Sequence, residues 1–543
     1  MRFRFAQSRE TPRSLFHSGF LEGLLLFLCF LLPIDLPAAE FAPVFTDNSV
    51  LQRDEPVAVW GTGRDGETVT IELFGHQSTA TVSNGRWRAE LPAMHAAENG
   101  TLRLKGDNEV ELKNIAVGEV WIASGQSNME WRLEQCAPLY DELIQSANDS
   151  GIRELKIPLR AYSGDPLPHM AWNKFVQGSA AKFGAVGYFF ASELRRELGV
   201  VVGIINCSYG GTPIEAWMER ETILSTIGNK LLEEDAKKMA QFSSLTEYET
   251  AWLEYLEARK VRASRKKAGL PAAEVGPLPQ KPYGYRTESR PGCLNESMLG
   301  VIRPYSARGV IWYQGENNHG NLEYKKMLEG FLSGIRKEWN KPQWPFLIAQ
   351  LSSNSAKLPD EGESFATIRE AQRQVAMETP GSGLVVTLDQ GEQGNVHPRF
   401  KNPVGERFAR LAMGRVYGRT DFTPQSPVAF SATRQNDGIL VCFHDVPKHL
   451  EIRGESPPIV EVRNALGDWL PATCEPAPDL KSILVIPPKE MKEVQAVRYA
   501  WRNFCSLSIY SDQGLPVSPW NLAVGDRESM VPSGPDECRD LKK

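Results

Sequence analysis

The chain has 543 residues, of which 41% are apolar and 24% are charged, as in soluble globular proteins. This length predicts about two to four domains. The formal net charge of −6 is small for the size and argues against a nucleic-acid binder, which would need a basic face.

Residues 1–39 have the features of an export signal. Basic residues come first, an apolar stretch covers 24–32, and small residues that suit cleavage follow at 36–39. We therefore expect a signal peptide and a mature protein that is secreted or periplasmic. An uncleaved anchor is the alternative, although the apolar stretch is short for a bilayer, and no stable membrane span is expected after cleavage.

The remaining chain divides into three regions. Residues 40–115 contain short alternating segments such as Val69, Ile71 and Leu73, which predict an amino-terminal β-sandwich-like domain. Residues 116–420 alternate strands with helices, which predicts a mostly parallel sheet, with a helical insertion near 219–290. Residues 421–543 return to short strands and predict a carboxy-terminal β-sandwich-like domain.

The most informative segment is Gly118–Met129. An apolar strand over 120–123 stops at a Ser-Gly turn, and Gln126 and Ser127 follow at once. Ligands of open α/β sheets bind at the carboxyl ends of strands. Ser127 could act there as a nucleophile beside free backbone N–H groups, whereas the alternative is an ordinary strand-to-helix turn with a serine cap.

Two later strands end in similar polar or glycine-rich turns. The segment 204–217 places Gly210 and Gly211 after a strand, where a backbone N–H could hold an oxyanion, or where the glycines only form a turn. The segment 310–318 brings Gln314, Glu316 and Asn318 to the same edge, where an amide donor could stabilise negative charge.

A loop after a fifth strand, over 388–398, supplies a histidine. His397 alone among the eight histidines follows a strand end of the α/β region, just before the last helix of that region. Histidine is the usual general base for a serine nucleophile. Asn395 and Asp389 lie in the same loop.

Together these segments resemble the sialate O-acetylesterase family, a branch of the SGNH-type carbohydrate esterases. The resemblance covers nearly all of the chain after residue 39. It rests on Gly125–Met129, Tyr209–Trp217, Trp312–Asn318, Val396–Pro398, Pro403–Arg407, and on Phe45–Arg53, Val497–Trp501 and Gly514–Trp520 in the flanking regions.

The resemblance implies a flavodoxin-like α/β catalytic domain that removes O-acetyl groups from sugars without a metal or other cofactor. Ser127 would be the nucleophile and His397 the base. The N–H of Ser127, the N–H of Gly210 or Gly211, and the side chain of Gln314 would stabilise the oxyanion. Three further side chains would orient these groups or touch an acetylated sugar or glycan: Gln126, Glu316 and Asn318.

The chain departs from the family at one position. The family commonly has Asp-x-His-Pro, whereas this chain has Asn395 two residues before His397. Three outcomes stay open: a carboxylate of Asp389, Glu392 or Glu316 takes the role, the pair works as a slower dyad, or the esterase is retired and only binds glycans. Among esterases, an acetyl-xylan-type polysaccharide esterase is the alternative, and an SGNH-type lipase is disfavoured because no apolar lid is evident.

Overall fold

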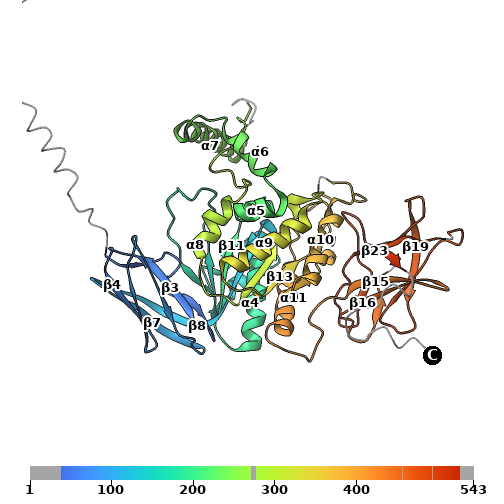
Figure 1. The fold of residues 1–543 in the computed structure, drawn as a ribbon, viewed down its shortest axis with the longest axis horizontal. Coiled ribbons are helices and arrows are strands. Elements are labelled where there is room, and N and C mark those ends of the chain that lie inside the picture. The colour runs from blue at the N-terminus through green and yellow to red at the C-terminus, as the bar shows by residue number, and fades with distance from the viewer. Residues whose placement is uncertain (1–37, 271–276, 357, 455–456, 492, 526–543) are drawn as a thin grey trace, which may run out of the picture.

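The computed structural model describes residues 38–270, 277–356, 358–454, 457–491 and 493–525. The predicted signal peptide, apart from its last two residues, lies outside the described residues. Three parts follow one another along the molecule: a β part, a mixed α/β part and a second β part (Figure 1). Among the described residues, no helix has both the length and the apolar character to cross a membrane.

The N-terminal part is built from short strands that bury alternate side chains. Val69, Ile71 and Leu73 are buried and their neighbours in the strand are not, as expected when one face of a sheet packs on a core. One sheet contains β1 (Glu40–Phe41), β3 (Val57–Thr62) and β6 (Arg86–Leu91). The other contains β2 (Val50–Gln52), β4 (Thr68–Leu73), β5 (His76–Thr81), β7 (Ala97–Lys105) and the first half of β8 (Glu109–Gly125).

Strand β8 continues without a break into the central sheet. Burial alternates over residues 109–114 and is complete from Ile115 to Gly125. The first half pairs antiparallel with β7, and the second half pairs parallel with strands of the central sheet. The expected boundary at residue 115 therefore falls inside a single strand, at the point where its second face also becomes buried.

The central sheet has the strand order β10-β9-β11-β8-β12-β13-β14, parallel except for the edge strand β10. Its strands are β9 (Asn148–Lys156), β10 (Trp172–Val176), β11 (Val202–Ser208), β12 (Gly309–Tyr313), β13 (Phe346–Ala349) and β14 (Ser382–Val385). Helices α4 (Ala185–Leu198) and α11 (Asn402–Arg415) pack together on one face, and α9 (Tyr324–Glu338) and α10 (Ser364–Glu378) on the other. The strands of the sheet interior are buried throughout, as in sheets covered on both faces.

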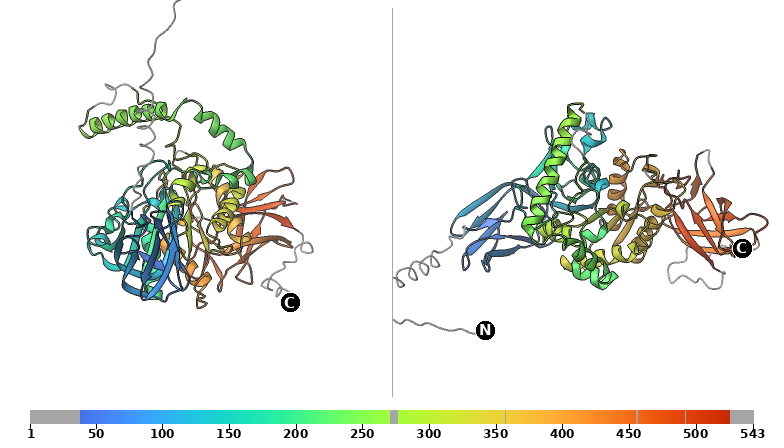
Figure 2. Two further views of the ribbon diagram at one scale, coloured as in Figure 1. Left: turned by 60° about the vertical axis from the view of Figure 1, so that its left-hand side comes forward. Right: turned by 90° about the horizontal axis from the view of Figure 1, so that it is seen from above.

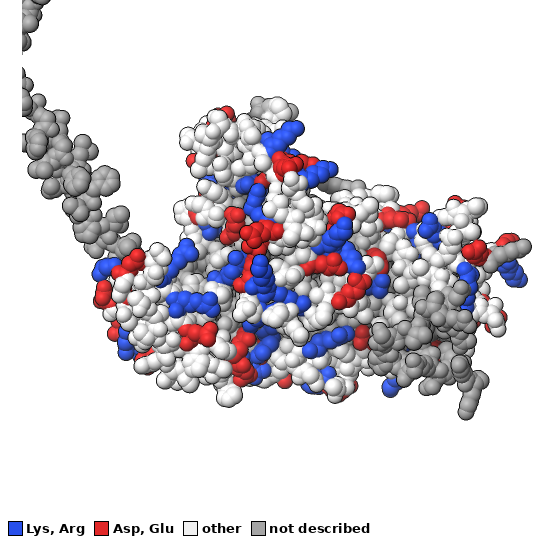
Figure 3. Space-filling model, viewed as in Figure 1, with Lys and Arg blue, Asp and Glu red and all other residues white. Residues whose placement is uncertain are grey.

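Between β11 and β12 the chain forms a helical arm. Helix α5 (Arg220–Ile227) packs on α9, whereas α6 (Lys230–Met239) and α7 (Leu245–Lys267) stand out from the body of the molecule (Figures 1 and 2). Short helices α2 (Ser127–Glu130), α3 (Asp141–Gln145) and α8 (Gly300–Ile302) complete the α/β part. Basic and acidic side chains are interspersed over the face seen in Figure 3.

The C-terminal part is a closed barrel, so the expectation of a sandwich-like domain is wrong there. The barrel order is β15-β16-β20-β19-β18-β21-β23, closed by the parallel pair β15 and β23. Alternation of apolar residues is the same in sandwiches and barrels, so the sequence pattern did not reveal the closure. The strands are β15 (Val428–Gln435), β16 (Gly438–His444), β18 (Val460–Arg463), β19 (Trp469–Pro476), β20 (Ile483–Ile486), β21 (Ala496–Tyr499) and β23 (Trp520–Gly525), with β17 (Leu450–Ile452) and β22 (Ile509–Ser511) as a separate pair.

Candidate active site

The carboxyl ends of three adjacent strands bring three of the predicted segments together. Strands β11, β8 and β12 are neighbours in the sheet, and Ser208, Gly125 and Tyr313 lie in register at their ends. Ser127 begins helix α2 directly after β8. The loop after β14 supplies the histidine from a distant part of the chain.

Ser127 and His397 are in hydrogen-bond contact. The distance between Ser127 Oγ and His397 Nε2 is 2.8 Å, across 270 residues of sequence. Burial lowers the pKa of His397, and the charge of Lys401 lowers it further. A neutral imidazole can accept the serine proton at Nε2, so this geometry suits a serine nucleophile and its base.

The turn that presents Ser127 depends on a glycine. Gly125 has φ of +132°, and a Cβ atom there would lie 2.2 Å from the carbonyl oxygen of Tyr313. Only glycine accepts both this conformation and this close approach. The turn is therefore fixed where β8 and β12 end together.

His397 bonds Ser127 through Nε2, and among the described residues no side chain has a hydrogen bond with its Nδ1, so none supplies the carboxylate of a triad. Asn395 Oδ1 accepts instead from the backbone N–H of His397, at 3.0 Å. Asn395 Nδ2 donates to Glu392 Oε2 and to the carbonyl of His397, each at 2.9 Å. Asp389 is held by Arg407, with its two oxygens 2.7 Å and 2.6 Å from the guanidinium nitrogens. The Asn395 amide therefore bonds the backbone of its own loop rather than the imidazole.

The predicted oxyanion donors differ in availability. The N–H of Gly210 donates to Glu130 Oε2 at 2.6 Å and is therefore occupied. Within the described ranges, the N–H groups of Ser127 and Gly211 have no acceptor. The Cβ position of Gly210 lies 3.2 Å from Ser127 Cβ, so this glycine loop passes directly beside the serine.

The predicted amide side chains bond one another and the neighbouring loops. Gln314 is fully buried, and its Nε2 donates to Asn318 Oδ1 at 2.7 Å and to the carbonyl of Thr212 at 3.2 Å. Asn318 also donates to Glu215 Oε2 at 2.9 Å. Gln126 Oε1 accepts from the N–H of Asn317 at 3.3 Å. Gln314 is thus already bonded at both of its amide hydrogens, which the sequence could not indicate.

Several side chains at the site escaped the sequence reasoning. Trp131 stacks on His397, with ring centroids 4.8 Å apart. Glu130 accepts a hydrogen bond from the N–H of Gly210. The Asn128 amide has hydrogen bonds with Glu316, the carbonyl of Val396 and Lys401. Asn128 lies in the motif that pointed to Ser127 and Glu130 directly follows this motif, so proximity was a usable signal for both.

A pocket of about 640 Å³ opens beside Ser127. Glu130, Trp131 and Lys156 are among its lining residues. This volume far exceeds that of an acetyl group and lies in the range of small-molecule sites. The pocket therefore has room for a sugar next to the serine.

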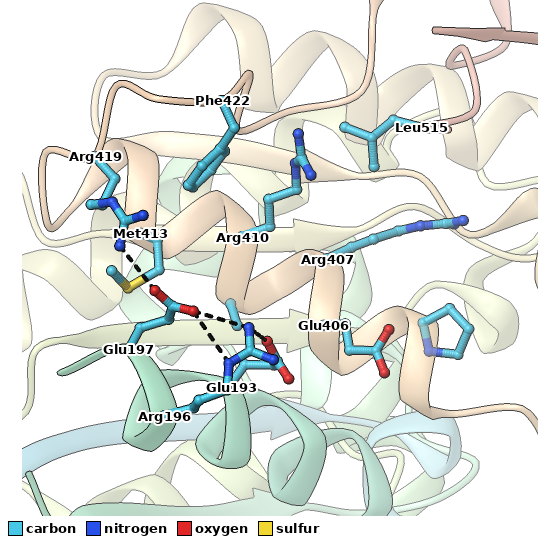
Figure 4. A pocket seen from close by; sticks show the side chains of 12 residues that line it. Glu193, Arg196, Glu197, Glu406, Arg407, Arg410, Met413, Arg419, Phe422 and Leu515 are labelled. Carbon is cyan, nitrogen blue, oxygen red and sulfur yellow. Dashed lines mark hydrogen bonds and ion pairs between the residues drawn. The ribbon is translucent and has the colours of Figure 1, made fainter. Parts of the chain in front are cut away.

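A second pocket of similar size lies between α4 and α11, and Ser127 is not among its lining residues (Figure 4). Its charged groups largely pair with one another: Arg196 contacts Glu193 and Glu197, and Arg419 contacts Glu197. We therefore place the candidate active site at the first pocket.

Comparisons with known proteins match the part of the chain that lines this pocket. A family model described as "Carbohydrate esterase, sialic acid-specific acetylesterase" matches residues 117–244 and 294–413. These ranges include the Ser127 turn, the glycine loop and His397, and they omit residues 245–293, which contain α7.

Similar proteins extend the match over most of the chain. The sialate O-acetylesterase of Rattus norvegicus is 23% identical over 89% of this chain and 94% of the rat protein. The sialate O-acetylesterase of Homo sapiens is 24% identical over 90% of this chain and 93% of the human protein. The crystal structure of a carbohydrate acetylesterase from Xanthomonas citri covers 89% of this chain and 99% of its own, with 27% identity and a TM-score of 0.73. Residues 117–244 and 294–413 of this chain therefore match the carbohydrate esterase family of sialic acid-specific acetylesterases.

Proposed function

We propose that this protein is a serine carbohydrate esterase of the flavodoxin-like SGNH type that removes O-acetyl groups from sugars. The contact of 2.8 Å between Ser127 Oγ and His397 Nε2 carries this proposal. The family match and the sugar-sized pocket beside the serine support it. The export signal inferred at residues 1–39 suits an enzyme that meets glycans in a secreted or periplasmic location.

The reaction begins with attack of Ser127 Oγ on the acetyl carbonyl. His397 Nε2 takes the serine proton and then gives it to the oxygen of the departing sugar. The same histidine then takes a proton from a water molecule, which attacks the acetyl carbonyl; the bond to Ser127 Oγ breaks, His397 returns the proton to Oγ, and acetic acid leaves and ionises to acetate. The free N–H groups of Ser127 and Gly211 are the available donors to the oxyanion.

The pair works as a dyad in this proposal. Since His397 Nδ1 lacks an acidic partner among the described residues, no carboxylate stabilises the imidazolium directly. Stacking against Trp131 and the backbone contacts of the loop orient the ring instead. In serine proteases, replacing the acid of a triad by an amide lowers kcat by about 10⁴-fold, so we expect a slow enzyme or a compensating device.

One alternative is that the substrate is an acetylated plant polysaccharide such as xylan, because the same serine chemistry would deacetylate either a sialic acid or xylan. The other alternative is a protein that binds glycans without turnover, which the amide at position 395 allows. The intact contact between Ser127 and His397 favours turnover, since a retired site has no need of it.

Acetate release tests the proposal. We expect the mature protein to release acetate from 9-O-acetyl sialic acid or from acetylated xylan, and the preferred substrate identifies the sugar class. Ser127→Ala should lower kcat by about 10³-fold or more, whereas Ser225→Ala on helix α5 should not change it. Glycan binding without acetate release by the folded wild-type protein would contradict the proposal.

A further inference from the structure

A buried chain of three polar side chains lies under the serine and the histidine. Lys401, Asn128 and Glu316 are 1%, 0% and 8% exposed. Lys401 Nζ donates to Asn128 Oδ1 at 2.6 Å, and Asn128 Nδ2 donates to Glu316 Oε1 at 2.5 Å. A buried ammonium and a buried carboxylate are costly to keep away from water, so a role for them is expected.

The two charges fix the orientation of the Asn128 amide. The Lys401 ammonium lies at the amide oxygen and the Glu316 carboxylate at the amide nitrogen. A flipped amide would place its NH₂ group against the ammonium and its oxygen against the carboxylate, where neither can form a hydrogen bond. In the fixed orientation, Asn128 Nδ2 also donates to the carbonyl of Val396 at 3.0 Å. Asn128 directly follows Ser127, and Val396 directly precedes His397. One amide therefore ties the serine turn to the histidine loop.

The ammonium of Lys401 also lies over the aromatic ring that stacks on the imidazole. Its Nζ lies 5.8 Å from the ring centroid of Trp131, the same ring that stacks on His397, and 5.9 Å from that of Tyr313. Both distances suit cation–π contacts, which are strongest away from water. Lys401 thus reaches His397 through an aromatic ring on one side and through Asn128 on the other.

Outside these three side chains, the charged and titratable groups around Lys401 are Glu392, the Cys136 thiol and Arg399, which pairs with Glu392 at 3.8 Å. Glu316 and Glu392 act on Lys401 as anions, and the Cys136 thiol lies nearby with a pKa that burial raises. Burial lowers the pKa of Lys401 to about 8, and burial raises the pKa of Glu316. Lys401 is therefore a cation at neutral pH and loses this charge in mildly alkaline solution.

We propose that Lys401 is a positioning residue for the reaction: with Asn128 and Glu316 it holds the His397 loop against Ser127, in the place of a carboxylate on the imidazole. The inference rests on the proposed esterase function. It explains how a histidine without an acidic partner keeps its contact with the nucleophile. It also explains why a lysine is buried four residues after the histidine.

Two substitutions separate the charge of Lys401 from its hydrogen bond. Lys401→Met removes both, and Lys401→Gln removes the charge while an amide donor remains for Asn128. We expect Lys401→Met to lower kcat by about tenfold to a hundredfold with little change in KM, because a small displacement of His397 from Ser127 slows proton transfer without affecting sugar binding. Lys401→Gln should keep more of the kcat. Lys326→Met, on the exposed side of α9, is the control and should match the wild type.

The pH profile distinguishes positioning from a general loss of structure. The neutral imidazole is the active form, and the Lys401 cation opposes its protonation. Without the cation His397 titrates at higher pH, so the ratio of variant to wild-type kcat should fall as pH drops from about 8 to about 6. Both Lys401 variants should show this fall. Above pH of about 8, where wild-type Lys401 also loses its charge, the ratio should level off.

Labelling with a fluorophosphonate, which needs no sugar, keeps the two proposals apart. If the wild-type protein reacts at Ser127 and both Lys401 variants match it in rate and pH profile, this inference is wrong and the esterase proposal stands. If the folded wild-type protein neither reacts with the probe nor releases acetate, the esterase proposal fails and the inference fails with it. Slower labelling in both folded variants, with the shifted profile, supports the inference. Circular dichroism verifies folding, and Lys401→Gln carries the test should Lys401→Met not fold.

Discussion

The Asn395 side chain bonds the loop that carries His397 and does not bond the imidazole ring. Its amide bonds the backbone N–H and carbonyl of His397 and reaches Glu392, so it shapes the turn that carries the histidine. The imidazole then takes its orientation from Ser127 and from the stacked ring of Trp131. The family's aspartate at this position therefore cannot simply be restored by mutation.

Asn395→Asp should destabilise the protein without raising kcat. The new carboxylate would face the Glu392 carboxylate and the carbonyl of His397. In the wild type each of these accepts a hydrogen bond of 2.9 Å from the Asn395 amide. We expect a loss of about 1–3 kcal/mol in the free energy of unfolding near neutral pH, measured by urea denaturation. Adding Glu392→Gln restores a donor and should recover part of this loss. A kcat that rises about tenfold or more in Asn395→Asp alone would show that the imidazole turns to the new acid.

Strand β8 connects the N-terminal sheet to the site. Its 17 residues pair with β7 and β2 in one half and with β11 and β12 in the other, and they end at the turn that carries Ser127. The strand end is constrained by Gly125, whose φ is +132°. The position of Ser127 thus depends on the packing of two strand ends as well as on the local turn.

Gly125→Ala should lower the free energy of unfolding far more than an alanine does at a glycine with free space around it. The added Cβ would lie 2.2 Å from the Tyr313 carbonyl oxygen, which belongs to rigid backbone. We expect a loss of about 3 kcal/mol or more in unfolding free energy, together with most of the kcat. Gly199→Ala, at the end of α4 with φ of +68° and no atom within 4 Å, is the matched control and should cost about 1 kcal/mol. If urea denaturation gave equal losses of unfolding free energy for the two variants, β8 would be able to move away from the Tyr313 carbonyl, which would contradict this prediction.

The C-terminal barrel is attached to the α/β part through a buried arginine. Arg369 of helix α10 is fully buried and donates to the carbonyls of Leu351, Ser352, Arg502 and Asn503, at 2.9 Å, 3.0 Å, 2.5 Å and 2.8 Å. Burial lowers the pKa of Arg369 to about 10, so it stays charged in neutral solution. One guanidinium thereby bonds the backbone of the α/β part and that of the loop between β21 and β22 in the C-terminal part.

Arg369→Met should loosen this attachment. Four carbonyls would lose the guanidinium as a donor, and of these four only that of Asn503 keeps another donor among the described residues, the N–H of Asn354, so we expect a loss of about 3 kcal/mol or more in unfolding free energy. Calorimetry should show the barrel unfolding in an earlier, separate transition. Arg453→Met, which removes an exposed ion pair with Glu451, is the control and should change stability by about 1 kcal/mol or less. A single unchanged transition in Arg369→Met would contradict the role of this residue.

The sequence was informative wherever a feature is local. Apolar runs followed by polar turns identified the ends of β8, β11 and β12, and parallel strands bring such ends to one edge, so Ser127 and the glycine loop could be placed together. Pairing between distant segments left no local pattern. The closure of β15 on β23, the occupied amide of Gln314 and the partner of Lys401 all depend on such pairing.

The reactivity of Ser127 is the property to measure first. The wild-type protein is incubated with a fluorophosphonate near neutral pH, and the modified peptide is found by mass spectrometry. We predict one label per chain, at Ser127, no label in Ser127→Ala, and labelling slowed by about a hundredfold or more in His397→Ala. Absence of the label from the folded wild-type protein, or labelling that His397→Ala leaves unchanged, would contradict a serine activated by this histidine.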